Sequence, residues 1–84
     1  MTNRSAIVTG STGFVAGHLI EQLVREGYDV TGIDINKRTQ PPTHWTEFIE
    51  DLRDFEKIRT ILTKVRPDIV FHLAAQTSVA VSAR

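Results

Sequence analysis

Residues 8–23, VTGSTGFVAGHLIEQL, place a glycine-rich turn between an apolar run and a helix-forming run. Glycine is a poor helix former, so its use where a helix must begin needs a physical reason. One reason is a plain turn between a strand and a helix. The other is that Gly10 and Gly13 leave the backbone bare, so that a large anionic group can approach its N–H groups.

Around this turn, apolar strand-forming runs alternate with amphipathic helical runs. Residues 5–9 predict a buried strand, and residues 14–25 predict a helix because their apolar side chains recur every three or four positions. The rest of the chain predicts strands at 28–34, 47–51 and 68–75, a loop with two prolines at 35–46, and a helix at 55–65 with Asp54 as its N-cap.

This order of elements predicts an α/β fold with a Rossmann-like, doubly wound parallel sheet. Right-handed crossovers give the strand order 3-2-1-4 with one helix on each face, which is the first half of a dinucleotide-binding fold. The strand at 68–75 is then expected at an exposed edge, where a fifth strand would pair. Residues 1–84 are therefore expected to be the N-terminal part of such a domain, with its remainder absent.

The glycine turn falls at the carboxyl end of the first strand, where open α/β sheets bind ligands. The following helix points its unpaired N–H groups and positive dipole end at that place, which suits a pyrophosphate. Asp34 ends the second strand 21 residues after Gly13, and an acid there can accept both ribose hydroxyls and repel a 2′-phosphate. Its alternative is a solvated turn residue. Together these features favour NAD over NADP, although Lys37 and Arg38 follow the acid and suit a phosphate.

Composition excludes several other functions. Ten basic residues balance ten acidic ones, which argues against nucleic acid or an anionic membrane as a partner. The chain has no cysteine, which fits a cytoplasmic protein, and it has no apolar run of membrane-spanning length. Its three histidines, at 18, 44 and 72, lack metal-ligand spacing, so no metal site is predicted.

Three segments, 8–34, EDLRD at 50–54 and PDIVFHLAAQTSV at 67–79, resemble in order and spacing the signatures of the extended short-chain dehydrogenase/reductase family. More narrowly they resemble its NAD-dependent sugar-nucleotide epimerases, dehydratases and reductases. The family pattern T-G-x-x-G-F-x-G is met from Thr9 to Phe14 but departs at Ala16, where a third glycine is usual. That position controls helix–strand packing rather than contact with phosphate.

The resemblance implies a role for each matching position. The turn at Gly10 and the backbone of Thr12, Gly13, Phe14 and Val15 would hold the pyrophosphate, and Asp34 the adenosine ribose. Asp51 and Leu52 would flank the adenine; Leu73, Ala74 and Ala75 would run past a ribose; Gln76 would face the nicotinamide or the substrate. Each has a plainer alternative: Asp51 as a strand-end carboxylate, residues 73–75 as tight packing, and residues 76–78 as a helix start.

The resemblance also implies a tyrosine, with a lysine four residues later, that moves a proton during hydride transfer. The only tyrosine is Tyr28, and Gly32 stands four residues on, so no catalytic residue is predicted and this chain alone is expected to be inactive. The leading hypothesis is the NAD-binding portion of a homodimeric enzyme acting on a nucleotide-activated sugar, whose substrate domain is absent from this chain. The alternatives are a non-catalytic dinucleotide sensor or scaffold, and a truncation without activity.

Overall fold

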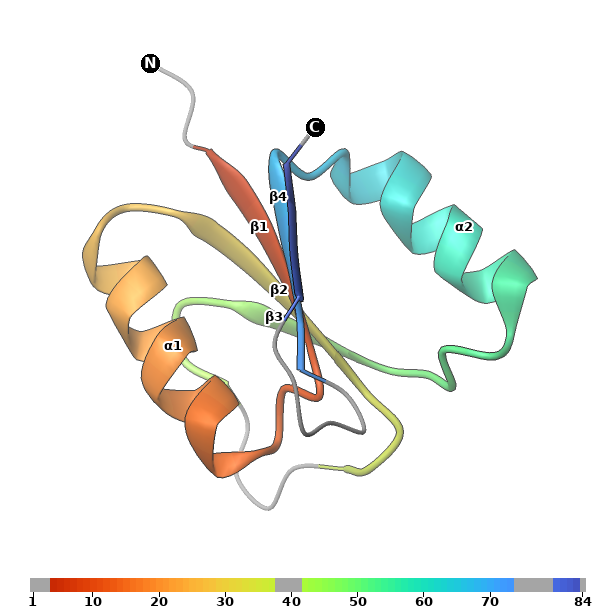
Figure 1. Cartoon of the computed structure of the whole chain (residues 1–84), viewed down its shortest axis with the longest axis horizontal. Helices are drawn as coiled ribbons and strands as arrows, with labels where there is room; N and C mark the ends of the chain where they lie inside the picture. The colour runs from red at the N-terminus through yellow and green to blue at the C-terminus, as the bar shows by residue number, and fades with distance from the viewer. Residues whose placement is uncertain (1–3, 38–41, 74–79, 84) are drawn as a thin grey trace.

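The computed structural model describes residues 4–37, 42–73 and 80–83, which form one sheet flanked by two helices (Figure 1). The elements in chain order are β1 Ser5–Thr9, α1 Phe14–Arg25, β2 Asp29–Asp34, β3 Thr46–Ile49, α2 Phe55–Val65, β4 Ile69–His72 and β5 Ala80–Ala83. The spatial order is β3-β2-β1-β4-β5, and the first four strands are parallel. The predicted order 3-2-1-4 and the doubly wound topology are confirmed. None of the described helices is long and apolar enough to span a membrane.

The expectation that the strand at 68–75 forms an exposed edge is wrong. Ala80–Ala83 pair with it in antiparallel register, from Ile69 opposite Ala83 to His72 opposite Ala80. A bare strand edge leaves N–H and C=O groups unpaired, and this next segment satisfies them. The link of residues 73–79 is shorter than the dozen or more residues of a parallel crossover, so the new strand is antiparallel.

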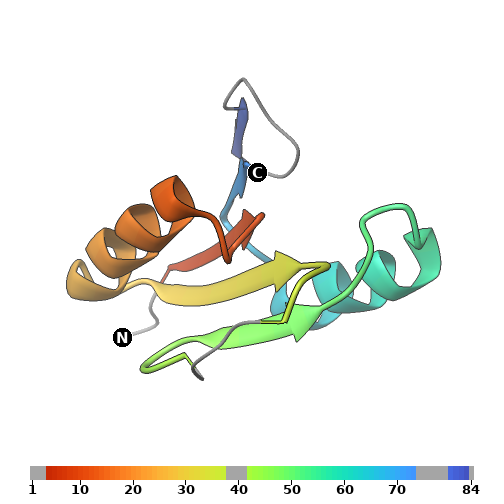
Figure 2. The same cartoon turned by 90° about the horizontal axis from the view of Figure 1, so that it is seen from below.

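The core lies in two layers, one on each face of the sheet. In β1, Ala6 and Val8 pack beneath α1, whereas Ile7 between them faces α2, as the two-residue period of a strand requires. Figure 2 shows the two helices on opposite sides of the sheet. The α1 layer also contains buried Ala16, Ile20, Leu23 and Val30, and the α2 layer contains buried Ile33 and Ile61.

Strand ends differ from the predicted ranges by one residue at the amino ends of β2, β3 and β4, and by two or three residues at the carboxyl ends of β3 and β4. The third strand ends at Ile49; the Glu50 N–H still donates to the Asp34 carbonyl at 2.9 Å, and the chain then turns. The turn is stabilised locally because the Asp51 carboxylate accepts the Arg53 N–H at 2.9 Å. The fourth strand ends at His72, and the predicted site residues Ala74, Ala75 and Gln76 lie outside the described residues.

Candidate cofactor-binding site

The loop between β1 and α1 is a tight turn wrapped over the end of β2. Gly10 has φ +71°, a left-handed conformation that favours glycine, and its N–H donates to the Ile33 carbonyl at 2.8 Å. The Gly13 N–H donates back to the Gly10 carbonyl at 3.0 Å, and a Cβ on Gly13 would lie only 3.3 Å from that oxygen. Conformation therefore favours glycine at position 10, and close packing favours it at position 13.

The amino end of α1 is open. Among the described residues no side chain caps this helix, its N-cap is Gly13, and its first turn holds no acidic residue. Gly17 donates to the Gly13 carbonyl at 2.9 Å, so the N–H groups of residues 14–16 have no acceptor within the helix. The residues Phe14 and Val15 are 83% and 63% exposed, so this positive end of the helix dipole lies at the surface.

Ala16, the departure from the family pattern, fits its place. It is buried in the α1 layer of the core, and its methyl group packs there with Ile20 and Val30. Gly17 does not replace the missing glycine, because a Cβ at that position would have no atom within 4 Å. The substitution therefore leaves the loop and the helix start intact.

Asp34 joins the end of β2 to the glycine loop. Its side chain is buried; Oδ2 accepts the Thr12 N–H at 2.9 Å and the Thr12 hydroxyl at 2.8 Å, while Oδ1 accepts the Asn36 N–H at 2.8 Å. Burial alone raises the pKa of Asp34, but the hydrogen bonds from Asn36, Thr12 and Ile35 outweigh it and lower the pKa below 3.8. The carboxylate is therefore charged at neutral pH and is held against the loop.

A hollow of about 610 Å³ lies at this edge of the sheet. Seven of the nine predicted site residues that the structure describes line it: Gly10, Thr12, Gly13, Asp34, Asp51, Leu52 and Leu73. It is also lined by Ile33, Ile35, Asn36, Glu50 and Arg53, which the sequence did not single out. The signal in the sequence that could have found Ile35 is its place directly after Asp34, the acid that ends a strand; the structure leaves this isoleucine exposed.

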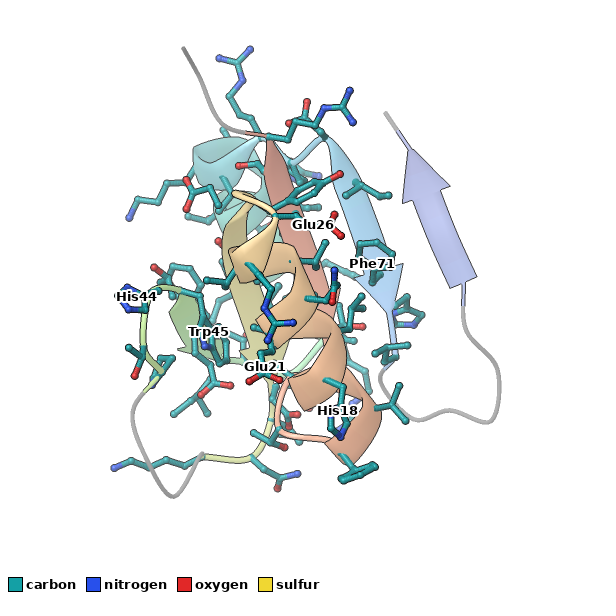
Figure 3. All side chains as sticks on the ribbon, turned by 90° about the vertical axis from the view of Figure 1, so that its left-hand side faces the viewer. His18, Glu21, Glu26, His44, Trp45 and Phe71 are labelled. Carbon is teal, nitrogen blue, oxygen red and sulfur yellow. The ribbon has the colours of Figure 1, made fainter. Side chains whose placement is uncertain are left out.

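Phe14 and Val15 do not line this hollow. Phe14 instead borders a second groove, between α1 and residues 42–45, where its ring meets His18 edge to face at 4.7 Å. Figure 3 shows Trp45 and His44 on that side of α1. What these two predicted residues offer at the site is therefore their backbone N–H groups, not their side chains.

Asp51 sits at the rim of the hollow in an ion pair. Its carboxylate accepts two hydrogen bonds from Arg53 Nε, at 3.1 and 3.2 Å, and one from Nη2 at 2.7 Å. The Arg53 side chain and then the Arg53 N–H lower the pKa of Asp51 to about 2, and the same pair raises the pKa of Arg53. Because the pair is exposed, it fixes the direction of this carboxylate more than it stabilises the fold.

Thr9 ties β1 to β4 on the other side of the loop. Its hydroxyl is hydrogen-bonded to His72 Nδ1 at 2.7 Å and accepts the Leu73 N–H at 3.0 Å. This contact holds the end of β4 beside the glycine turn and gives His72 a structural role. Within the described ranges, no group of three or more His, Cys, Asp or Glu residues is placed to hold a metal ion.

Comparison with known proteins identifies the family. Residues 6–84 match the model of the NAD dependent epimerase/dehydratase family. The chain belongs to this family. The family membership, the Rossmann-like fold and NAD as the cofactor of the family, all predicted from the sequence, are thereby confirmed.

Relatives and solved structures agree with this assignment. The chain is 36% identical over 87 residues to a CDP-glucose 4,6-dehydratase of Salmonella typhimurium, covering 94% of this chain and 24% of that protein. It superposes on the UDP-glucose 4-epimerase of Thermotoga maritima, crystallised with UDP-glucose, with a TM-score of 0.79 and 32% identity, covering 88% of this chain and 25% of the other. It also superposes on the UDP-glucose 4-epimerase of Thermus thermophilus, crystallised with NAD, with a TM-score of 0.77 and 36% identity. That match covers 88% of this chain and 25% of the other. The chain thus spans about a quarter of the length of these proteins.

Proposed function

We propose that this chain is the NAD-binding, N-terminal part of a larger enzyme that epimerises, dehydrates or reduces a nucleotide-activated sugar. One observation carries the proposal: the uncapped amino end of α1 and the charged Asp34 carboxylate meet at one glycine loop, beside a hollow. An adenine dinucleotide presents a pyrophosphate and a ribose in that order, so it matches both groups.

We propose that the pyrophosphate binds fewer backbone N–H groups than the four that the sequence predicted. The Thr12 N–H donates to Asp34, and the Gly13 N–H donates to Gly10, so both are engaged within the loop. We therefore assign the phosphates to the N–H groups of Phe14 and Val15, at the open end of α1.

The adenosine belongs beside Asp34. A carboxylate accepts about four hydrogen bonds, so ribose hydroxyls take its remaining capacity or replace the Thr12 hydroxyl, which can rotate away. The aliphatic side chains of Ile35 and Leu52 both line the hollow and provide apolar surface for the adenine. Because Asp34 is charged at neutral pH, it disfavours a 2′-phosphate, which supports NAD rather than NADP.

When bound, NAD supplies a hydride acceptor, and the residues of this chain bind and orient it. The group that moves the hydroxyl proton lies elsewhere: Tyr28 is half-buried against the α1 layer, just before β2 and at the opposite end of that strand from the hollow. We therefore expect the Tyr-x-x-x-Lys pair after residue 84 and expect this chain alone to be inactive. As the resemblance implies, we propose that the larger protein is a homodimer and acts on a nucleotide sugar. We also propose a cytoplasmic location, which the absence of cysteine favours.

The test is a titration of the protein at its full encoded length with NAD and with NADP. We expect NAD to bind at least about tenfold more tightly than NADP. Asp34→Ala is expected to weaken NAD binding and to remove the preference for NAD over NADP, because it removes the charge that discriminates between them. Asp29→Ala is the matched control, since Asp29 is an exposed aspartate at the other end of β2.

Equal affinity for the two cofactors, unchanged by Asp34→Ala, would contradict the ribose assignment. Tight NAD binding without turnover of any nucleotide sugar would favour the non-catalytic sensor instead.

A further inference from the structure

Ser11, in the middle of the glycine loop, is a polar side chain with no exposed surface. Its hydroxyl donates to Oε2 of Glu47 at 2.7 Å, and Glu47 belongs to β3, two strands away from β1. This is a charge-assisted hydrogen bond in a part-buried place, where its loss is costly. Glu47 does not line the hollow at Asp34.

A glycine in the strand between them makes this contact possible. Gly32 of β2 pairs with Val8 on one side and with Glu47 on the other, so all three positions project on the same face of the sheet. A Cβ on Gly32 would lie 2.6 Å from Ser11 Cβ, 2.9 Å from Ser11 Oγ and 2.5 Å from Trp45 Cζ3. The bare position therefore admits the Ser11 side chain and lets Glu47 reach it across β2.

Two adjacent loop residues are thus held by two carboxylates from neighbouring strands. Glu47 holds Ser11 and Asp34 holds Thr12, while the Gly10 N–H is bonded to the Ile33 carbonyl. A loop already held in one conformation loses less conformational freedom when a ligand binds. The two carboxylates differ in position, because only Asp34 lines the hollow.

We propose that Ser11, Gly32 and Glu47 form a brace that positions the loop for the pyrophosphate, with Glu47 acting through Ser11 as a positioning residue. The brace rests on the proposed NAD-binding function. It differs from the role of Asp34 because it serves the phosphates alone, whereas Asp34 serves the ribose as well.

Two ligands separate these roles: NAD, which carries the pyrophosphate, and adenosine, which does not. In the full-length protein, Glu47→Leu is expected to lower the affinity for NAD about tenfold, because one charge-assisted hydrogen bond is lost. The affinity for adenosine is expected to change by less than about twofold. Glu47→Gln keeps an oxygen acceptor and is expected to stay within about threefold of the parent. Asp34→Ala is expected to weaken the binding of both ligands. The control is Glu21→Leu, at an exposed glutamate of α1, which is expected to weaken the binding of neither.

A double-mutant cycle tests the contact itself. Ser11→Ala and Glu47→Leu remove the same hydrogen bond, so the double variant is expected to bind NAD about as well as the weaker single variant. Additive losses, or equal losses for NAD and adenosine, would overturn the brace.

Amide hydrogen exchange tests the brace without any ligand, which keeps it separate from the proposed function. Glu47→Leu is expected to speed exchange at Thr12 and Gly13 about tenfold while leaving α2 unchanged. If the parent binds no NAD, the proposed function fails while this measurement still decides whether the brace exists. Unchanged exchange at Thr12 and Gly13 would refute it, and Ser11→Ala provides the same readout if Glu47→Leu does not fold.

Discussion

The two helices begin in opposite ways. In the part of the chain that the structure describes, α1 starts after Gly13 with neither a capping side chain nor an acid in its first turn. By contrast, α2 starts after Asp54, whose carboxylate accepts the Lys57 N–H, and it carries Glu56 in its first turn. Both are ordinary amphipathic helices packed on one sheet. The difference is that α2 neutralises its own positive end, whereas α1 leaves that end uncapped.

This contrast has a cost in helix stability for α1, the helix that we propose binds the ligand. A side-chain cap contributes about 1 kcal/mol to a helix, and α1 forgoes it. In exchange, the N–H groups of Phe14 and Val15 and the helix dipole stay available to an anion. The loop itself is then held from the sheet side, through Ser11 and Thr12.

The largest effect is expected from giving α1 the kind of start that α2 has. Gly13 has φ −73° and ψ 160°, which any N-cap residue adopts, so Gly13→Asp places a carboxylate on the amides meant for the pyrophosphate. We expect NAD affinity to fall about 100-fold, because the new charge both occupies these amides and repels the phosphates. Isothermal titration calorimetry with NAD measures the loss.

The control is Gly13→Ala, which adds the Cβ 3.3 Å from the Gly10 carbonyl but no charge. It is expected to cost only a few-fold in affinity. If Gly13→Asp binds NAD as the parent does, the pyrophosphate does not lie at the start of α1.

A smaller effect is expected from the backbone of the same loop. Gly10→Ala forces a side chain into φ +71° and should destabilise the protein by about 1–2 kcal/mol. Gly17→Ala is the matched change inside α1, where a Cβ would have no atom within 4 Å and so meets no clash. It should stabilise the protein by about 0.5–1 kcal/mol, because alanine has a higher helix propensity than glycine. Urea unfolding measures both. If Gly10→Ala instead stabilises the protein as Gly17→Ala does, the loop does not hold this turn.

The smallest effect is expected at the capped helix. Asp54→Ala removes an acceptor that lies 3.4 Å from the Lys57 N–H, a long hydrogen bond, so we expect a loss of about 0.5 kcal/mol in unfolding free energy. NAD affinity should not change, because this end of α2 is not part of the proposed site. A clear loss of NAD binding in Asp54→Ala would remove the distinction between the two helix starts.

Much of the site was predictable because its residues follow strand ends. Gly10, Asp34 and Leu73 come at or just after the carboxyl ends of parallel strands, and such ends share one edge of the sheet. The carboxylate of Asp51 was also placed at this edge, but its partner Arg53 was not foreseen. An ion pair between residues two apart depends on the local turn, which the pattern of apolar residues does not specify.

The antiparallel strand β5 was missed for a related reason. The segment AVSA at 80–83 is four residues long and includes a serine, and so short a segment does not distinguish a strand from the start of a helix. Its pairing with β4 depends on the length of the link before it and on the open edge beside it, which are properties of the assembled sheet.

The sequence by itself determined the strand–helix order, the handedness of the crossovers and hence the place of the glycine turn at the switch point. These follow from periodicity and chain chirality, which act locally. Only the tertiary structure decided which amides of the turn stay open, because Thr12 and Gly13 lose theirs to Asp34 and Gly10. It also decided that Glu47 reaches Ser11 over Gly32, since strand register brings together residues that are far apart in the chain.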